Sequence, residues 1–77
     1  MIGLHKVTHV QTPNGRYVAV STADTFDAGW ETMVFRSDSH EILDFDDLDR
    51  MNYNSRQEAE AGHQKMIEKW KRTSLIP

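Results

Sequence analysis

The C-terminal part of the chain carries its strongest structural signal, a capped helix with one apolar face. Ser55 is followed three residues later by Glu58, a capping box that satisfies backbone N–H groups at a helix start. Apolar or small residues then recur at spacings of three and four, and these are Ala59, Gly62, His63, Met66, Ile67 and Trp70. The pattern predicts a helix over residues 56–71 that covers another layer of structure.

The size of the chain predicts one small domain. It has 77 residues and no cysteine, so no disulfide supports a fold that buries only about 60% of its unfolded surface. Small domains of this kind often gain stability by self-association, and a homodimer is therefore left open. We expect one domain over residues 1–72 and a frayed tail over residues 73–77.

The first part of the chain reads as a β-hairpin. Runs rich in β-branched residues flank Asn14-Gly15, and this dipeptide favours a two-residue type I′ turn. With that turn Gln11 faces Val18, and each face of the hairpin carries both apolar and polar side chains. The hairpin therefore does not indicate which face meets the helix.

Further strands are predicted downstream of the hairpin. The dense apolar run over residues 30–35 is typical of a central third strand. Residues 41–45 are expected to form a short fourth strand, and residues 46–49 a single helical turn. The predicted fold class is α+β, with a three- to four-stranded antiparallel sheet in β-β-β-β order and the C-terminal helix packed across it.

Charge is distributed unevenly along the chain. Residues 24–50 carry nine acidic residues against two arginines, although the formal net charge of the chain is only −3. An acidic middle argues against direct nucleic-acid binding and favours docking on a basic partner. The candidate protein-binding residues are Asp38, Glu41, Asp44, Asp46, Asp47 and Asp49. The alternative is that these acidic residues form a solvent-exposed edge whose role is to keep the protein soluble.

The same aspartates do not form a calcium motif. A calcium-binding loop starting at Asp44 needs glycine at its sixth position and glutamate at its twelfth. The chain has Asp49 and Ser55 at these positions. We expect no metal site and no cofactor.

His63 is the one histidine on the apolar face of the helix, next to Gly62. A glycine in a helix interior costs about 1 kcal/mol relative to alanine, which indicates that the helix approaches the sheet closely there. His63 is then expected to be buried and hydrogen-bonded, with a pKa below its usual value. Glu31 is a candidate partner in a catalytic dyad, but no serine or threonine is marked as a nucleophile. We therefore expect no enzymatic activity.

The last two thirds of the chain resemble a family of small uncharacterised proteins of bacteriophages and prophages. The resemblance rests on residues 31–35 (Glu-Thr-Met-Val-Phe), Leu48-Asp49, Tyr53, Glu58-Ala59 and Gly62-His63, with Met66 and Trp70. It implies a viral protein acting inside the host cell, and it implies no catalytic residues.

These observations combine into a functional expectation. The leading hypothesis is a non-enzymatic phage-type protein that docks on a host protein through its acidic segment and inhibits a bacterial defence or regulatory protein. The alternative is a homo-oligomeric structural or assembly accessory protein of a phage. No apolar run approaches the roughly 20 residues that span a bilayer, so we expect a cytoplasmic protein with no membrane contact. Trp30 and Trp70 are each either core or interface residues.

Overall fold

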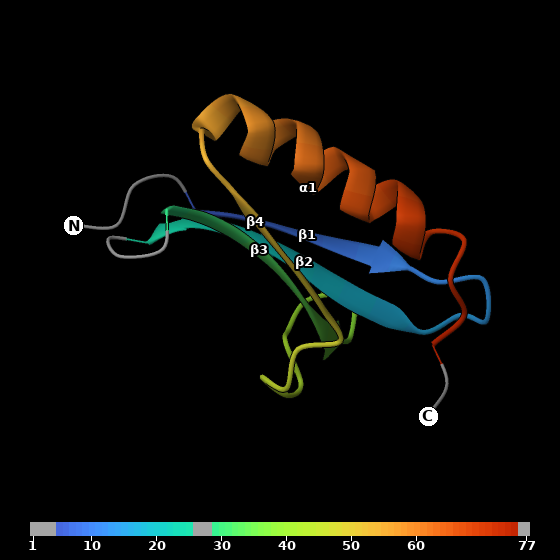
Figure 1. Cartoon of the computed structure of the whole chain (residues 1–77). Coiled ribbons are helices and arrows are strands. Elements are labelled where there is room, and N and C mark those ends of the chain that lie inside the picture. The colour runs from blue at the N-terminus through green and yellow to red at the C-terminus, as the bar shows by residue number, and fades with distance from the viewer. Residues whose placement is uncertain (1–4, 26–28, 76–77) are drawn as a thin grey trace.

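The computed structural model describes residues 5–25 and 29–75. The strands are β1 (His5–Gln11), β2 (Tyr17–Thr25), β3 (Gly29–Ser37) and β4 (Asp49–Tyr53), followed by the helix α1 (Arg56–Trp70). The strands form one antiparallel sheet in the order β1-β2-β3-β4, and α1 lies across one face of it (Figure 1). The predicted α+β fold is confirmed.

The start of α1 is set by the predicted cap. The Ser55 hydroxyl accepts the backbone N–H of Glu58 at 3.2 Å, while the Glu58 carboxylate accepts the backbone N–H of Asn54 at 3.2 Å. Two backbone donors that the helix itself cannot satisfy are thereby paired. All six residues of the predicted apolar face are buried. No helix in the described residues is long and apolar enough to span a membrane.

The hairpin turn differs from the predicted two-residue turn. Gly15 donates its N–H to the carbonyl of Thr12 at 3.0 Å, and Thr12 donates to the carbonyl of Arg16 at 2.8 Å. Gly15 has φ of +81°, whereas Asn14 does not have the positive φ that a type I′ turn requires. The loop therefore has three residues, because Pro13 suits the second position of a type I turn and Gly15 the bulge after it.

This longer loop moves the register of β1 on β2 by one residue. Val10 pairs with Val18, and Gln11 pairs with Tyr17 instead of the predicted Val18. A one-residue slip exchanges the faces of a strand, so Val10, Val18 and Val20 now share the face that meets α1, whereas Val7 lies on the other face and is 40% exposed. The core cluster on this face consists of Val10, Val18, Val20, Val34, Met66, Ile67, Trp70 and Leu75.

The predicted fourth strand at residues 41–45 and the predicted helical turn at residues 46–49 are both wrong. Only an isolated bridge between Ser37 and Ile42 forms there, and β4 begins at Asp49. The side chains of Asp38 and Asp44 accept backbone N–H groups two residues ahead at 2.7 Å. Such local bonds compete with both strand and helix, so residues 38–48 form a loop.

The C-terminal tail packs on the domain as far as the structure describes it. Leu75 is 8% exposed and belongs to the core. Its carbonyl accepts a 2.7 Å hydrogen bond from the Asn14 side chain. Leu75 therefore packs on the domain, the frayed tail expected over residues 73–77 stays a prediction, and residues 76–77 lie outside the described residues.

Trp70 closes the core at the end of α1. It is 7% exposed, and its indole N–H donates to the Asp49 carboxylate at 3.2 Å. Trp30, by contrast, is half-buried. Trp70 is therefore a core residue.

We expect Trp70→Ala to lower the free energy of unfolding by about 3–5 kcal/mol, the usual range for truncating a buried aromatic side chain. Trp70→Phe keeps most of the ring but loses the bond to Asp49, so its loss should be smaller. Urea unfolding of both variants measures the difference. An unchanged midpoint in Trp70→Ala would show that Trp70 is not part of the core.

Candidate functional site

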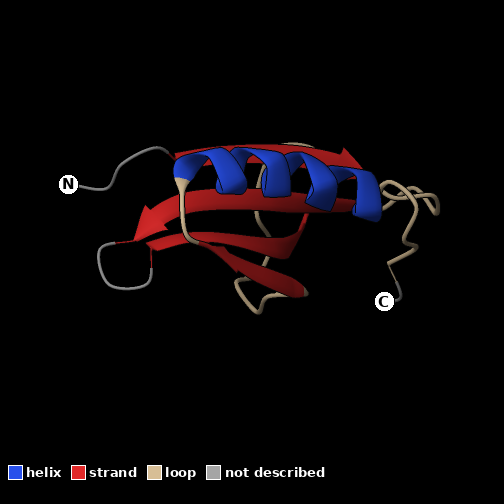
Figure 2. Ribbon diagram, turned by 45° about the horizontal axis from the view of Figure 1, so that its top comes forward, coloured by secondary structure: helices blue, strands red, loops and turns tan. Residues whose placement is uncertain are grey.

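Residues 38–48, named here the acidic loop, project from the face of the sheet opposite α1 (Figures 1 and 2). The loop holds five of the six acidic residues expected to bind a partner: Asp38, Glu41, Asp44, Asp46 and Asp47. Asp44 is partly buried and the other four are exposed. The loop is therefore the candidate site.

The first turn of the acidic loop is organised by Asp38. Its carboxylate accepts the backbone N–H groups of His40 at 2.7 Å and Glu41 at 2.6 Å. These two bonds hold the pKa of Asp38 below its usual value. The His9 ring nitrogen lies 3.1 Å from the Asp38 carbonyl oxygen, which ties the turn to β1. A charged carboxylate thus keeps the turn in one conformation.

The rest of the loop returns along β3. The backbone N–H groups of Leu43 and Leu48 donate to the carbonyls of Arg36 and Val34, at 2.9 and 2.7 Å. Backbone bonds therefore hold the loop against β3 at its middle and at its C-terminal end. Its acidic side chains are presented by an ordered segment, which lowers the entropic cost of binding.

Two apolar side chains stand among the acidic ones. Leu43 is 64% exposed and Phe45 is 73% exposed. The Phe45 ring nevertheless packs edge-on against Phe35, with ring centroids 5.3 Å apart. The Phe45 ring is held by the contact with Phe35 and is otherwise largely open to solvent. It therefore resembles the aromatic anchor residues that dominate protein–protein binding energy.

Asp49 does not belong with the other five acidic residues. It lies on the α1 side of the sheet, where its carboxylate accepts hydrogen bonds from Lys69 at 2.6 Å and from Trp70. Partial burial alone would raise the pKa of Asp49, but these bonds and one from the Arg50 backbone outweigh burial and lower it. Asp49 joins β4 to α1.

The exposure of Leu43 and Phe45 was missed from the sequence. Both residues fall in the wrongly predicted fourth strand, where one face would have been buried. The available signal was the acidic residue on either side of Phe45, at Asp44 and Asp46. A strand with such neighbours has little apolar surface to bury on its other face.

A second cluster of polar side chains is buried between α1 and the sheet. The His63 ring nitrogens lie 2.9 Å from the Thr8 hydroxyl and 2.6 Å from the Thr22 hydroxyl. Thr22 is in turn 2.6 Å from the hydroxyl of Thr32, which hydrogen-bonds to Tyr53. These five residues, named here the polar chain, cross all four strands. No described buried side-chain nitrogen or oxygen lacks a partner.

The polar chain does not form the catalytic pair considered from the sequence. Glu31 lies on the opposite face of the sheet, where it accepts a 3.4 Å bond from Asn52. His63 is 2% exposed and Thr22 is 3% exposed, so a substrate has no route to either group in this conformation. The predicted burial of His63 is confirmed, and the dyad with Glu31 that the sequence left open does not form.

Burial lowers the pKa of His63 below its usual value, and the nearby positive charge of Lys6 acts in the same direction. Both effects penalise the imidazolium form. His63 is therefore neutral in the folded protein at neutral pH. One ring nitrogen then donates and the other accepts.

This shift makes folding sensitive to acid. Because the unfolded chain binds the His63 proton more tightly, the free energy of unfolding should fall as the pH drops below about 6.5. The loss continues until the pH passes the folded-state pKa. An NMR titration should give His63 a pKa below 6.5, and unfolding at several pH values should show the slope. A value at or above 6.5 would contradict this, and His40→Gln is the control that should keep the slope.

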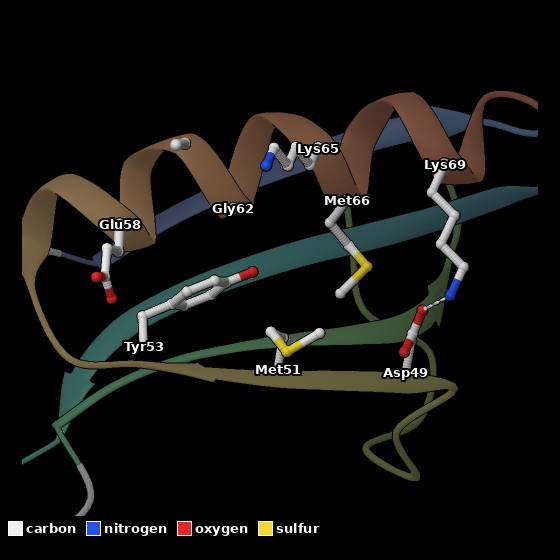
Figure 3. A pocket seen from close by; sticks show the side chains of 9 residues that line it. Asp49, Met51, Tyr53, Glu58, Gly62, Lys65, Met66 and Lys69 are labelled. Atoms are coloured by element: carbon white, nitrogen blue, oxygen red, sulfur yellow. Dashed lines mark hydrogen bonds and ion pairs between the residues drawn. The ribbon is translucent and has the colours of Figure 1, made fainter.

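A groove of about 440 Å³ lies between α1 and the outer strand β4. Figure 3 shows Met51 and Tyr53 below and Met66 above, with the ion pair of Lys69 and Asp49 closing one end. A methyl group added to Gly62 would lie 2.0 Å from the Tyr53 ring. The close approach predicted for Gly62 is confirmed, and the group that approaches is the Tyr53 ring.

Gly62→Ala should therefore destabilise the protein, although alanine is favoured over glycine in helices by about 1 kcal/mol. The added methyl must displace the Tyr53 ring, at a cost of about 1–3 kcal/mol. In a Tyr53→Ala background the clash is absent, and the same substitution should become stabilising. Thermal unfolding of the four proteins in this cycle measures the sign change. Destabilisation in both backgrounds would show that the ring is not the obstacle.

The described residues contain no group of three or more histidine, aspartate or glutamate side chains placed to hold a metal ion. Comparisons of the chain with protein-family models, curated proteins and solved structures gave no match. The functional argument therefore rests on the acidic loop and its surroundings.

Proposed function

We propose that the protein is a non-enzymatic binding protein that docks on a host protein through the acidic loop. The observation that carries the proposal is Phe45, which is 73% exposed yet packed against Phe35. A large exposed aromatic side chain in a small protein has a cost in solubility, and clustered exposed apolar residues mark interaction sites. Leu43, two residues earlier in the same loop, is a second exposed apolar side chain.

The acidic residues define the chemistry of the partner. Acidic residues flank Phe45 and Leu43 along the acidic loop, and four of the five are exposed. The complementary surface is therefore an apolar pocket with a rim of lysine and arginine. Opposite charges of this kind steer association and fix the docking register. Since Asp49 is engaged by Lys69 and Trp70, the proposed contact surface omits it and includes the two apolar residues.

The biological setting of the proposal comes from the resemblance to the bacteriophage and prophage family. That setting is the cytoplasm of a bacterial host, and we propose that docking inhibits a defence or regulatory protein there. This part rests on analogy of setting. The alternative, a self-associating assembly protein of a phage, is favoured by a different feature, the open edge of β4.

The double substitution Asp46→Lys with Asp47→Lys should weaken docking. It places like charges against the basic rim, so association should slow by about tenfold or more. Phe45→Ser should weaken binding by about 2 kcal/mol, as expected for an aromatic anchor. Both effects are measured by capturing the partner from bacterial lysate and titrating the purified complex with salt.

A matched control uses Glu60→Lys with Glu68→Lys. These residues are exposed on α1, on the other side of the sheet from the acidic loop, and the change in charge is the same. This variant should capture the partner as the wild-type protein does. If the loop variants, shown to be folded, retain full capture without added salt sensitivity, the loop is only a solvated edge.

A further inference from the structure

We propose that a second copy of this chain pairs with β4, in antiparallel register about Met51, to form a two-fold dimer with one continuous sheet. β4 is an outer strand of the sheet, so within residues 5–25 and 29–75 no strand lies beside its free edge. Such an edge is a template for pairing with another chain. The inference is independent of docking through the acidic loop.

The composition of β4 leaves this edge open to association. Edges that avoid pairing carry lysine, proline or a bulge, or are short and charged. β4 (Asp49–Tyr53) is short and carries Asp49 and Arg50, but it has no lysine, proline or bulge along its five paired residues, and the Asp49 carboxylate is bound by Lys69 and Trp70. Its central residue, Met51, is 51% exposed and lines the groove beside α1 (Figure 3). A neighbouring strand would cover this apolar side chain.

The strand is complementary to itself in one register. With Met51 opposite Met51 of the second copy, Asp49 faces Tyr53 of that copy and Arg50 faces its Asn52. All five residues are paired, and no like charges meet directly. Shifting the strands so that Arg50 faces Arg50 would oppose two positive charges, which is destabilising.

Opposite charges also meet between β4 of the second copy and β3 of the first. On the face away from α1, Asn52 is the cross-strand neighbour of Glu31 and donates to its carboxylate at 3.4 Å. No ion pair to Glu31 forms among the described residues. In the proposed register, Arg50 of the second copy lies on the far side of Asn52 in the same row. Its side chain is 51% exposed, and its one ion pair among the described residues is a 3.6 Å contact to Asp47, so it is available to Glu31.

The two-fold axis is perpendicular to the joined sheet in this arrangement. Both copies of α1 then lie on one face, and both acidic loops lie on the other. A dimer would present two acidic loops in one direction, so a partner with repeated sites would be bound by both.

The first test is the concentration dependence of the mass of the wild-type protein. Sedimentation velocity from about 1 µM to about 1 mM covers the range in which a weak dimer dissociates. We expect a shift from monomer to dimer within this range. A monomer at every concentration would overturn the proposal.

A charge exchange tests the register. Glu31→Lys and Arg50→Glu should each raise the dimer dissociation constant by about tenfold, within the range of coupling for contacting residues. The double variant restores opposite charges across the interface and should return close to the wild-type constant. A dimer that neither single substitution weakens, or that the double variant does not restore, would overturn this register.

A cysteine test is clean because the chain contains no cysteine. Met51→Cys places two thiols directly opposite each other, and mild oxidation should give a cross-linked dimer. In Arg50→Cys the two thiols are offset diagonally, with their Cα atoms beyond the roughly 7 Å limit for a disulfide. We expect cross-linking in Met51→Cys and little in Arg50→Cys. Equal cross-linking of both variants would contradict the register.

Discussion

The structure depends on satisfying one buried histidine. Burying an imidazole is costly unless its nitrogens find partners, and His63 finds them in hydroxyls of β1 and β2. The chain of bonds continues through Thr32 to Tyr53, so α1 is positioned over all four strands by directional contacts. Apolar packing alone would tolerate sliding of the helix along the sheet. The polar chain removes that freedom, and Gly62 allows the Tyr53 ring to fit beneath the helix.

The two faces of the sheet serve different purposes as a result. One face of the sheet is buried in the core, where α1 and Leu75 cover it. The other has no helix, and the acidic loop covers only part of it through the contact of Phe45 with Phe35. The core between α1 and the sheet stabilises the fold, so the acidic loop does not have to bury its side chains. It can carry charged residues and exposed apolar side chains. Its backbone bonds to β3 keep it ordered without burying its side chains.

An element could be predicted from the sequence when the residues that determine it lie close together along the chain. The helix cap and apolar face lie within Ser55 and the 15 residues of α1 that follow it, and both were predicted correctly. The hairpin register depended on Pro13, whose fixed φ favours a type I turn over the type I′ turn that Asn14-Gly15 suggests. The strand at residues 41–45 failed because carboxylate bonds to the backbone replaced strand pairing. The exposure of Phe45 and the partners of His63 depend on tertiary contacts, which neither spacing nor composition encodes.

The order of strands has a consequence for how the protein is made. Each strand pairs with its neighbour along the chain, so the sheet can assemble while the polypeptide is still emerging from the ribosome. The contacts that bury it join distant positions, Thr8 with His63 and Asn14 with Leu75. Until α1 and Leu75 have been synthesised, they cannot cover the valines of this sheet face. The nascent chain therefore exposes an apolar sheet face for part of its synthesis, which is the kind of surface that chaperones protect.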